Sequence, residues 1–301
     1  MTKNKYKRVV AVDTDTGEII GNTFLKNGEE VVLSTKKVLS DNQKDYLQKK
    51  TDIGQLSKSL GGYVHVFYVK DELLYNELNL NPADVSRFLY LATYISYNYK
   101  DKNLLAKKEK RQYKPMELSD IKKIMKLGKS SFYDFIKEIK NKNLLIENNG
   151  VFYINNKYIS KGEVKDNNKN NYIRLYIDTT RYLYENCTSR QHKQLGYVLK
   201  LLPYADFETN HILINDEKAE IRDIMKLLGL SVEGVNAVNK FKKMLLNFKI
   251  NYQDKEYYLF GAHTFEYGKE YRTYFVINPL VLFGGNNLGY FNDVFAQLRI
   301  K

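Results

Sequence analysis

Residues 121–136 read IKKIMKLGKSSFYDFI, and the order of apolar residues in this stretch predicts the fold. Ile and Met recur every three or four positions up to Leu127, which is typical of a short amphipathic helix. Gly128 interrupts the pattern, Ser130 follows, and a second apolar series begins at Phe132. Two short amphipathic helices joined by a turn with Gly are the sequence form of a helix-turn-helix motif.

A similar stretch begins one hundred residues later. Residues 221–231 read IRDIMKLLGLS, with Ile, Ile, Met, Lys and Leu at the same spacings as in residues 121–127. The similarity extends beyond the helices, because residues 153–162 and residues 276–284 each contain an Ile-Asn pair followed by a Gly. A repeat of this length indicates that a whole structural unit is duplicated.

The composition indicates a folded protein with an excess of positive charge. The chain has 301 residues and 43% hydrophobic content, which is enough for two domains with cores of their own. Lys and Arg number 48 against 35 Asp and Glu, and the net charge of +13 favours a polyanionic partner such as nucleic acid. A basic surface also increases solubility, so the charge leaves other partners open.

The sequence lacks the signals of a membrane or secreted protein. No apolar run approaches the ~20 residues that a transmembrane helix needs. The basic N-terminus is followed only by the short apolar run Val9–Val12, which is too short for a signal peptide. Cys187 is the only cysteine, which excludes an intrachain disulfide and a thiolate metal site. We therefore expect a cytoplasmic protein without a membrane partner.

Residues 1–60 are expected to form a small β unit and a basic linker. Alternation and turn chemistry predict a β hairpin with its turn at Asp13–Gly17 and a third candidate strand at residues 31–33. The two carboxylates in the turn are interpreted as turn residues, because no third carboxylate completes a metal site. The polar residues that follow form either a linker or a loose helix from Ser40.

The first helix-turn-helix lies within a predicted winged-helix domain, residues 61–162. The expected elements are a strand at 63–69, a helix at 83–97, a short strand at 103–105, a basic loop at 107–114, helices at 117–126 and 129–141, and wing strands at 144–146 and 151–154. The buried stripe of the second helix should consist of Phe132, Phe135, Ile136 and Ile139. Asn149-Gly150 is a strong hairpin signal and predicts the tip of the wing.

After a polar linker at residues 163–171, residues 172–301 are expected to repeat this domain. The expected elements are a strand at 172–177, a leading helix at 194–202, a strand at 211–214, helices at 219–227 and 231–247, and wing strands at 257–260 and 273–277. The predicted fold class is therefore α+β, with tandem winged helix-turn-helix domains and a small N-terminal β unit.

In a winged helix, the second helix enters the major groove, and the wing and nearby loops contact phosphates. The candidate DNA-binding residues of the first domain are Lys107, Lys108, Lys110, Arg111, Lys122, Lys123, Lys126, Lys129, Ser130, Ser131, Tyr133, Lys137 and Lys140. Those of the second domain are Ser231, Asn236, Lys240 and Lys243. Two alternatives stay open. A basic helical face is often only solvated, and the second domain either reads a second DNA segment or mediates self-association in a homodimer.

The sequence offers no constellation of residues typical of an enzyme. The four histidines are scattered at positions 65, 192, 211 and 263, and there is no carboxylate cluster or phosphate-binding Gly-rich loop. His65 has Tyr63 and Phe67 at the positions where a relaxase-type replication nuclease needs a second histidine for its metal. We therefore expect a binding protein that is not an enzyme and needs neither a cofactor nor a metal.

Residues 60–162 resemble the winged-helix replication proteins of Gram-positive plasmids and their phages, the RepL type. The matching features are the strand at Gly62–Val69, Ser130-Ser131-Phe132-Tyr133 in the helix-turn-helix, Lys142–Ile146 before the wing, and the Tyr-Ile-Asn…Gly pattern of residues 153–162. The tandem arrangement is also similar to plasmid initiators with two winged helices. The resemblance implies an initiator that binds origin repeats in double-stranded DNA and recruits host replication proteins. A plasmid or phage repressor with the same DNA-binding surface is the alternative.

Overall fold

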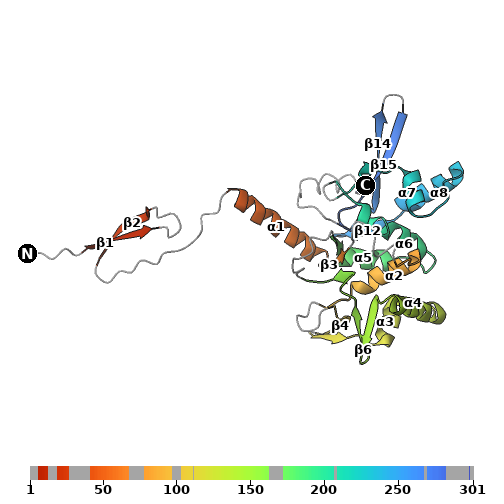
Figure 1. Ribbon diagram of the computed structural model, residues 1–301, viewed down its shortest axis with the longest axis horizontal. Helices are drawn as coiled ribbons and strands as arrows, with labels where there is room; N and C mark the ends of the chain where they lie inside the picture. Colours follow the sequence, from red (N-terminus) through yellow and green to blue (C-terminus); the bar gives the residue numbers. More distant parts are fainter. Residues whose placement is uncertain are drawn as a thin grey trace, which may run out of the picture. The chain divides into compact units, whose positions relative to one another are not determined.

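The computed structural model is a mixed α+β protein with small antiparallel sheets, which confirms the predicted fold class at this coarse level (Figure 1). It describes residues 6–12, 19–26, 41–67, 78–96, 103–110, 112–162, 172–206, 209–267, 270–282 and 298. The chain divides into two compact units, Met1–Tyr46 and Leu47–Lys301. The predicted linker at 163–171 lies outside the described residues.

The described part of the first unit contains a β hairpin. β1 (Tyr6–Val12) pairs antiparallel with β2 (Ile19–Lys26), which confirms the predicted hairpin. The turn residues and the third candidate strand at 31–33 lie outside the described residues. α1 (Asp41–Ser59) follows, so the helical alternative for this stretch is confirmed.

The second unit is organised around a three-stranded antiparallel sheet. β3 (Tyr63–Phe67) lies between β8 (Ile159–Ser160) and β9 (Tyr172–Tyr176). One face of this sheet belongs to the main hydrophobic core through Val64, Val66, Ile173 and Leu175. Because β3 and β9 come from different copies of the repeat, the two copies share one sheet. The strand predicted at 172–177 ends at Tyr176, since Ile177 begins α5 (Ile177–Glu185), a helix that the sequence analysis missed.

Two helices, one from each copy, pack against each other at the centre of the second unit (Figure 1). α2 (Pro82–Ala92) begins at Asn81, whose side chain accepts a hydrogen bond from Asp84 N at 3.0 Å. Its partner is α6 (His192–Leu199). A Cβ at Gly196 would lie 1.5 Å from the carbonyl oxygen of Pro82, so the side chain of any other residue would collide with α2 at this point.

Both central helices end before their predicted ends. α2 was expected to reach residue 97 but stops at Ala92, because Ile95 already pairs with Leu105 in an antiparallel bridge. α6 was expected to reach residue 202 but stops at Leu199, and the short 3-10 helix η2 (Leu202–Tyr204) follows. Apolar periodicity alone does not reveal such ends, because the residues beyond them are also buried.

The first helix pair agrees with the prediction. α3 (Leu118–Met125) begins with a capping box between Glu117 and Asp120, and Lys126 ends it with a φ of 50°. α4 (Lys129–Asn141) has the predicted bounds. Its predicted apolar stripe is buried and consists of Phe132, Phe135, Ile136 and Ile139.

A hairpin lies on each side of this helix pair in the sequence. β6 (Leu145–Asn148) and β7 (Val151–Ile154) form the predicted hairpin after α4, and Asn149 and Gly150 turn the chain with φ values of 50° and 76°. The prediction of a basic loop at 107–114 is wrong. β4 (Ala106–Glu109) and β5 (Gln112–Pro115) pair there as a second hairpin, with the positive φ of Lys110 at its turn.

The second copy repeats this order. Its first elements are the hairpin of β10 (Leu213–Ile214) and β11 (Glu217–Lys218), then α7 (Ile221–Leu227) and α8 (Val235–Leu246). α7 has the same capping box, formed by Glu220 and Asp223. The predicted start of the second helix at Ser231 is wrong, because Gly234 has a φ of 83° and α8 begins only after it.

Two hairpins follow α8 where one was predicted. β12 (Lys249–Tyr252) pairs with β13 (Lys255–Tyr258), and β14 (Phe260–Tyr267) pairs with β15 (Glu270–Ile277). The predicted pairing of residues 257–260 with residues 273–277 is therefore wrong except for Phe260. The reason is an unrecognised turn, since Gln253 and Asp254 have φ values of 51° and 59° and close the first hairpin.

Equivalent hydrogen bonds identify the matching parts of the two copies. The side-chain amide of Asn103 donates to the carbonyl oxygen of Ile154 at 3.1 Å, and that of Asn210 donates to Ile277 at 3.1 Å. Both asparagines have positive φ values, 63° and 53°. Because Ile154 ends β7 and Ile277 ends β15, the hairpin β14–β15 corresponds to β6–β7. The hairpin β12–β13 is an insertion in the second copy.

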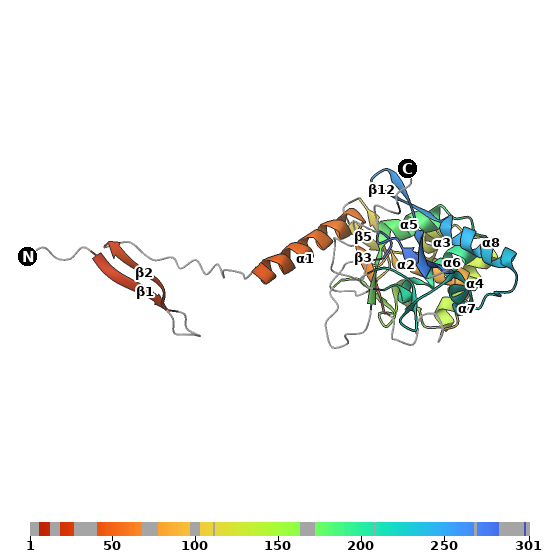
Figure 2. The same ribbon diagram turned by 90° about the horizontal axis from the view of Figure 1, so that it is seen from above.

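The pairing of β3 with β9 relates the two copies by an approximate twofold axis. The N–H groups of Phe67 and Tyr176 are equivalent, since each donates to the segment that follows the matching hairpin. Counting back two residues makes His65 equivalent to Arg174. His65 and Arg174 lie directly opposite each other in the antiparallel pair of β3 and β9. A rotation that exchanges the two copies therefore leaves the register of this strand pair unchanged, as a twofold axis requires. In agreement, α3–α4 and α7–α8 flank the central helices and lie toward the same side of the unit (Figures 1 and 2).

Candidate nucleic-acid interface

The N-terminus of α4 is open to solvent. No side chain caps its first turn, which follows Gly128. Lys129, Ser130 and Ser131 are all exposed there. The free backbone N–H groups and the positive end of the helix dipole favour an anion such as a phosphate group. This end of α4 therefore suits a phosphate contact, as the sequence predicts.

The outward face of α4 carries an aromatic ring, a base and an acid. Tyr133 is 46% exposed, and Nζ of Lys122 lies 5.7 Å from the centre of its ring. Lys137 is exposed one turn further along the helix. Asp134 accepts a hydrogen bond from Ser130 Oγ at 3.1 Å, so Ser130 already has a partner. Tyr133 and Lys137 are therefore exposed on the outward face of α4 and carry polar groups of the kind that base contacts use.

Lys107 contributes to the structure of the first copy through two ion pairs. Its Nζ lies 2.8 Å from Asp120 Oδ1 and 3.0 Å from Glu109 Oε1. The hydrogen bond to Asp120 is the main reason that the pKa of Lys107 is raised. Since Asp120 belongs to the capping box of α3, Lys107 joins the β4–β5 hairpin to the start of that helix. Its charge is therefore already balanced by two carboxylates, which makes it a weaker candidate for a phosphate contact.

The other basic residues near Lys107 are more available than Lys107 for contact with a phosphate. Lys108, Lys110, Lys123 and Lys126 are exposed, and no ion pair is found for them among the described residues. Arg111 lies outside the described residues. Tyr113 on β5 is 62% exposed and lies directly opposite Lys108 in the hairpin. The predicted loop at residues 107–114 gives Tyr113 no defined orientation, whereas the alternation of a strand places it on one face of the hairpin.

Lys140, at the end of α4, contacts the hairpin β6–β7. Its Nζ pairs with Glu147 and lies 5.4 Å from the ring of Phe152. Lys142 pairs with Glu138 at 3.3 Å. The two contacts of Lys140 connect the hairpin with α4, so Lys140 is a weaker candidate for direct DNA contact.

α8 presents a face without acids. Residues 235–246 contain no Asp or Glu, and the exposed side chains of this helix include Asn236, Asn239, Lys240 and Lys243. Glu233, which occupies a helical position in the predicted element, lies before the helix and donates its N–H to Ser231 Oγ at 3.3 Å. Ser231 is therefore a turn residue. The sequence analysis missed Asn239, although the spacing from the buried Phe241 could have placed it on the outward face.

The hairpin β14–β15 is the longest in the second copy. Each of its strands has 8 residues, against 4 in β6 and β7. Lys218 Nζ lies 5.0 Å from the ring centre of Phe265, and Arg272 lies 3.8 Å from Glu220. Tyr271 is 72% exposed. The hairpin extends beyond α7 in Figure 1, which makes it a second surface beside α8.

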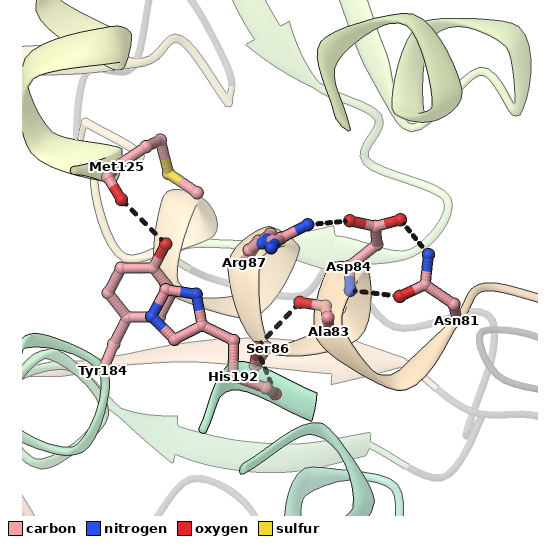
Figure 3. A network of polar contacts seen from close by, with 8 residues as sticks. All are labelled: Asn81, Ala83, Asp84, Ser86, Arg87, Met125, Tyr184 and His192. Atoms are coloured by element: carbon pink, nitrogen blue, oxygen red, sulfur yellow. Dashed lines mark hydrogen bonds and ion pairs between the residues drawn. The ribbon is translucent and has the colours of Figure 1, made fainter. Parts of the chain in front are cut away.

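A network of polar contacts at the start of α2 includes a hydrogen bond to α6 (Figure 3). Arg87 Nη1 donates to Asp84 Oδ1 at 2.8 Å, and Asn81 also binds this carboxylate. Ser86 Oγ donates to the carbonyl oxygen of His192 at 3.0 Å, which connects α2 with α6. Asp84, Ser86 and His192 are buried and Arg87 is half-buried, whereas Asn81 is exposed. Their loss would leave polar groups unpaired at the joint between the copies.

A stack of three rings continues from this joint to the first helix pair. Tyr184 lies between Tyr90 and His192, with ring centres 3.9 and 4.3 Å away. Tyr184 Oη donates to the carbonyl oxygen of Met125 at 3.0 Å, at the end of α3 (Figure 3). Burial, and then the charge of Arg87, lower the pKa of His192 to about 4. The second copy therefore fixes the position of α3 through a neutral imidazole and a buried hydroxyl.

Among the described residues, no group of three or more His, Cys, Asp and Glu side chains could hold a metal ion. No helix within the described part of the chain is long and apolar enough to cross a membrane. Comparisons with protein-family models, curated proteins and solved structures found no match. The two helix pairs, α3–α4 and α7–α8, are therefore the features of the molecule that indicate a function.

Proposed function

We propose that residues 61–301 contain two winged helices and that the protein binds double-stranded DNA in a sequence-specific manner, as a plasmid or phage replication initiator. One observation carries this proposal. α4 and α8, the second helices of the two copies, lie toward the same side of one compact unit, and each carries exposed polar and basic residues. A helix face of this kind fits the major groove, which is wide enough to admit an α-helix.

Phosphate contacts would come from the surroundings of these helices. Lys108, Lys110, Lys123 and Lys126 are exposed near α3 and α4. Lysines of this kind give affinity without reading sequence, and they make binding sensitive to salt. The open first turn of α4 would add backbone N–H contacts to a phosphate. The net charge of +13 agrees with a polyanionic partner.

The approximate twofold axis predicts the form of the target. Two recognition helices related in this way meet two half-sites in opposite orientation, separated by about one helical turn of DNA or a multiple of it. Because α4 and α8 expose different side chains, the two half-sites should differ in sequence. One chain would then bind an imperfect inverted repeat without a partner subunit.

An initiator and a transcriptional regulator would use the same surface. The resemblance of residues 60–162 to RepL-type proteins favours the initiator, which would act in the cytoplasm, recruit host replication proteins and need no catalytic step of its own. A plasmid or phage repressor is the second candidate function. Self-association through the second copy is compatible with either function, because hairpin β14–β15 exposes the rings of Phe265 and Tyr271.

Sequencing of the genomic DNA that the purified protein retains at about physiological salt distinguishes these functions. An array of short repeats near an AT-rich stretch is expected for an initiator, whereas a single site over a promoter would indicate a regulator. The double variant Lys137→Ala/Lys243→Ala should lose the enrichment, and Lys255→Ala on the inserted hairpin is the matched control. No enrichment over random DNA by the unaltered protein would contradict the proposal.

A further inference from the structure

The two proposed recognition helices can be aligned residue by residue. Phe135 and Ile139 anchor α4 in the core, and Phe241 and Leu245 anchor α8 with the same spacing. Outward positions follow from these anchors. Asn236 takes the place of Ser130, Asn239 that of Tyr133, and Lys243 that of Lys137. The second helix thus presents two carboxamides where the first presents two hydroxyl groups.

The two carboxamides on α8 are available for an external partner. Asn236 and Asn239 are exposed, and no hydrogen bond of either side chain is found among the described residues. In α4, by contrast, Ser130 already donates to Asp134. The position of Asp134 is taken by Lys240 in α8, so the neighbouring charge changes from negative to positive. Because it carries Lys240 instead of an acid, the exposed face of α8 suits the negative potential of a DNA groove better than the exposed face of α4.

The chemistry of the carboxamide selects one base. Asn carries a donor and an acceptor side by side, and in the major groove adenine presents the complementary pair, the N7 acceptor and the N6 donor. Guanine presents two acceptors at the corresponding edge, which suits Lys instead. Tyrosine at the equivalent position of α4 offers a single hydroxyl and cannot form this two-point contact.

We propose that Asn236 and Asn239 are the specificity-determining residues of α8 and that each reads an adenine, so that the α8 half-site is adenine-rich and the α4 half-site is not. This inference rests on the proposed DNA-binding function and adds an assignment of bases to one helix. Lys240 and Lys243 flank the two carboxamides and would hold the helix in the groove. The target is then an inverted repeat with unlike halves, and the chain has a defined orientation on it.

Selection of bound duplexes from a random library tests this assignment. The unaltered protein should enrich a motif with two half-sites, one of which contains strongly preferred adenines. In Asn239→Ala the preference at one of these adenines should fall about tenfold or more, which is the usual discrimination of a two-point base contact. Asn236→Ala should affect a different position in the same half-site, and the other half-site should be unchanged.

The matched control is Asn251→Ala, the same change at an exposed residue of the inserted hairpin, which should leave the motif intact. Both test positions are exposed on a helix, and Ala is a better helix former than Asn, so the variants should fold. If the unaltered protein enriches a motif and both asparagine variants select the same motif, the assignment is wrong although the DNA-binding function holds. If the unaltered protein enriches no motif, the proposed function itself fails.

Discussion

Gly196 of α6 and Pro82 of α2 lie in direct contact between the two copies, because a Cβ on Gly196 would lie 1.5 Å from the carbonyl oxygen of Pro82. The oxygen belongs to the backbone of α2 and cannot move aside as a flexible side chain would. The relative position of the two helix pairs therefore depends on the absence of a side chain at residue 196.

Gly196→Ala should lower the free energy of unfolding by ~1–3 kcal/mol or more, the usual cost of overpacking a dense interior. Urea unfolding measures the effect. Gly54→Ala is the control, because a Cβ there meets nothing within 4 Å and α1 should gain from the better helix former. Equal stability of the two variants would show that α2 and α6 are not packed as described.

Tyr184→Phe should destabilise the protein by about 0.5–1.5 kcal/mol, since it removes one buried hydrogen bond and leaves the carbonyl oxygen of Met125 unpaired. The ring stack with Tyr90 and His192 should persist. Tyr182→Phe removes a hydroxyl from a half-buried tyrosine of the same helix and is the control. If both variants unfold at the same urea concentration as the unaltered protein, the hydrogen bond from Tyr184 to Met125 does not contribute to stability.

Lys137→Ala should weaken binding to the cognate duplex by ~1–3 kcal/mol, with a smaller effect on random duplex, because its amine is expected to reach a base edge. Lys108→Ala and Lys110→Ala should instead weaken binding to all duplexes alike and reduce the slope of log affinity against log salt by about one each. Binding titrations at several salt concentrations separate the two classes. Equal losses on cognate and random DNA for Lys137→Ala would remove it from the reading surface.

Stability should fall as the pH decreases from 6.5 toward 4. Burial lowers the pKa of His65, His192 and His211 to about 4 each, below the value of about 6.5 in an unfolded chain. In this window the unfolded chain binds more protons than the folded one, so protonation favours unfolding. The stabilisation is complete above pH 6.5 and is lost as the pH falls.

The expected slope is at most ~1.4 kcal/mol per pH unit for each histidine. Urea unfolding at pH 7, 6 and 5 measures this slope. His192→Gln should reduce the slope by the contribution of one of the three histidines. A stability that is constant over this range would contradict the burial of these imidazoles.

The sequence predicted the elements that local patterns define. α4 has the predicted bounds because its apolar stripe is regular, and the hairpin after it follows from Asn149-Gly150. α5 was missed because it is rich in residues that favour strands. Thr179 Oγ1 donates to the carbonyl oxygen of Leu280 at 2.9 Å, and such tertiary contacts override local propensity.

Contacts between residues far apart in the chain could not be predicted from the sequence. The repeat predicted two similar units, but their union through β3 and β9 depends on residues more than one hundred positions apart, such as His65 and Arg174. In the candidate site, too, one feature follows from local sequence and another does not. The face of α4 was predicted correctly from periodicity, whereas the face of α8 depends on the positive φ of Gly234, which shifts the start of the helix.

Chemical cleavage of DNA from tethered iron chelates tests most directly whether α4 and α8 both contact one duplex. A single exposed cysteine would be placed at the end of each helix in turn, as Asn141→Cys or Asn247→Cys. Cys187 should not compete for the reagent, because burial raises the pKa of its thiol to about 11.

On the retained genomic duplex, we expect two cleavage centres, one from each position, about one helical turn or a multiple of it apart. Cleavage from Asn141→Cys alone would mean that the second copy serves another partner. Cleavage from neither position would contradict the proposal that the two helices bind DNA.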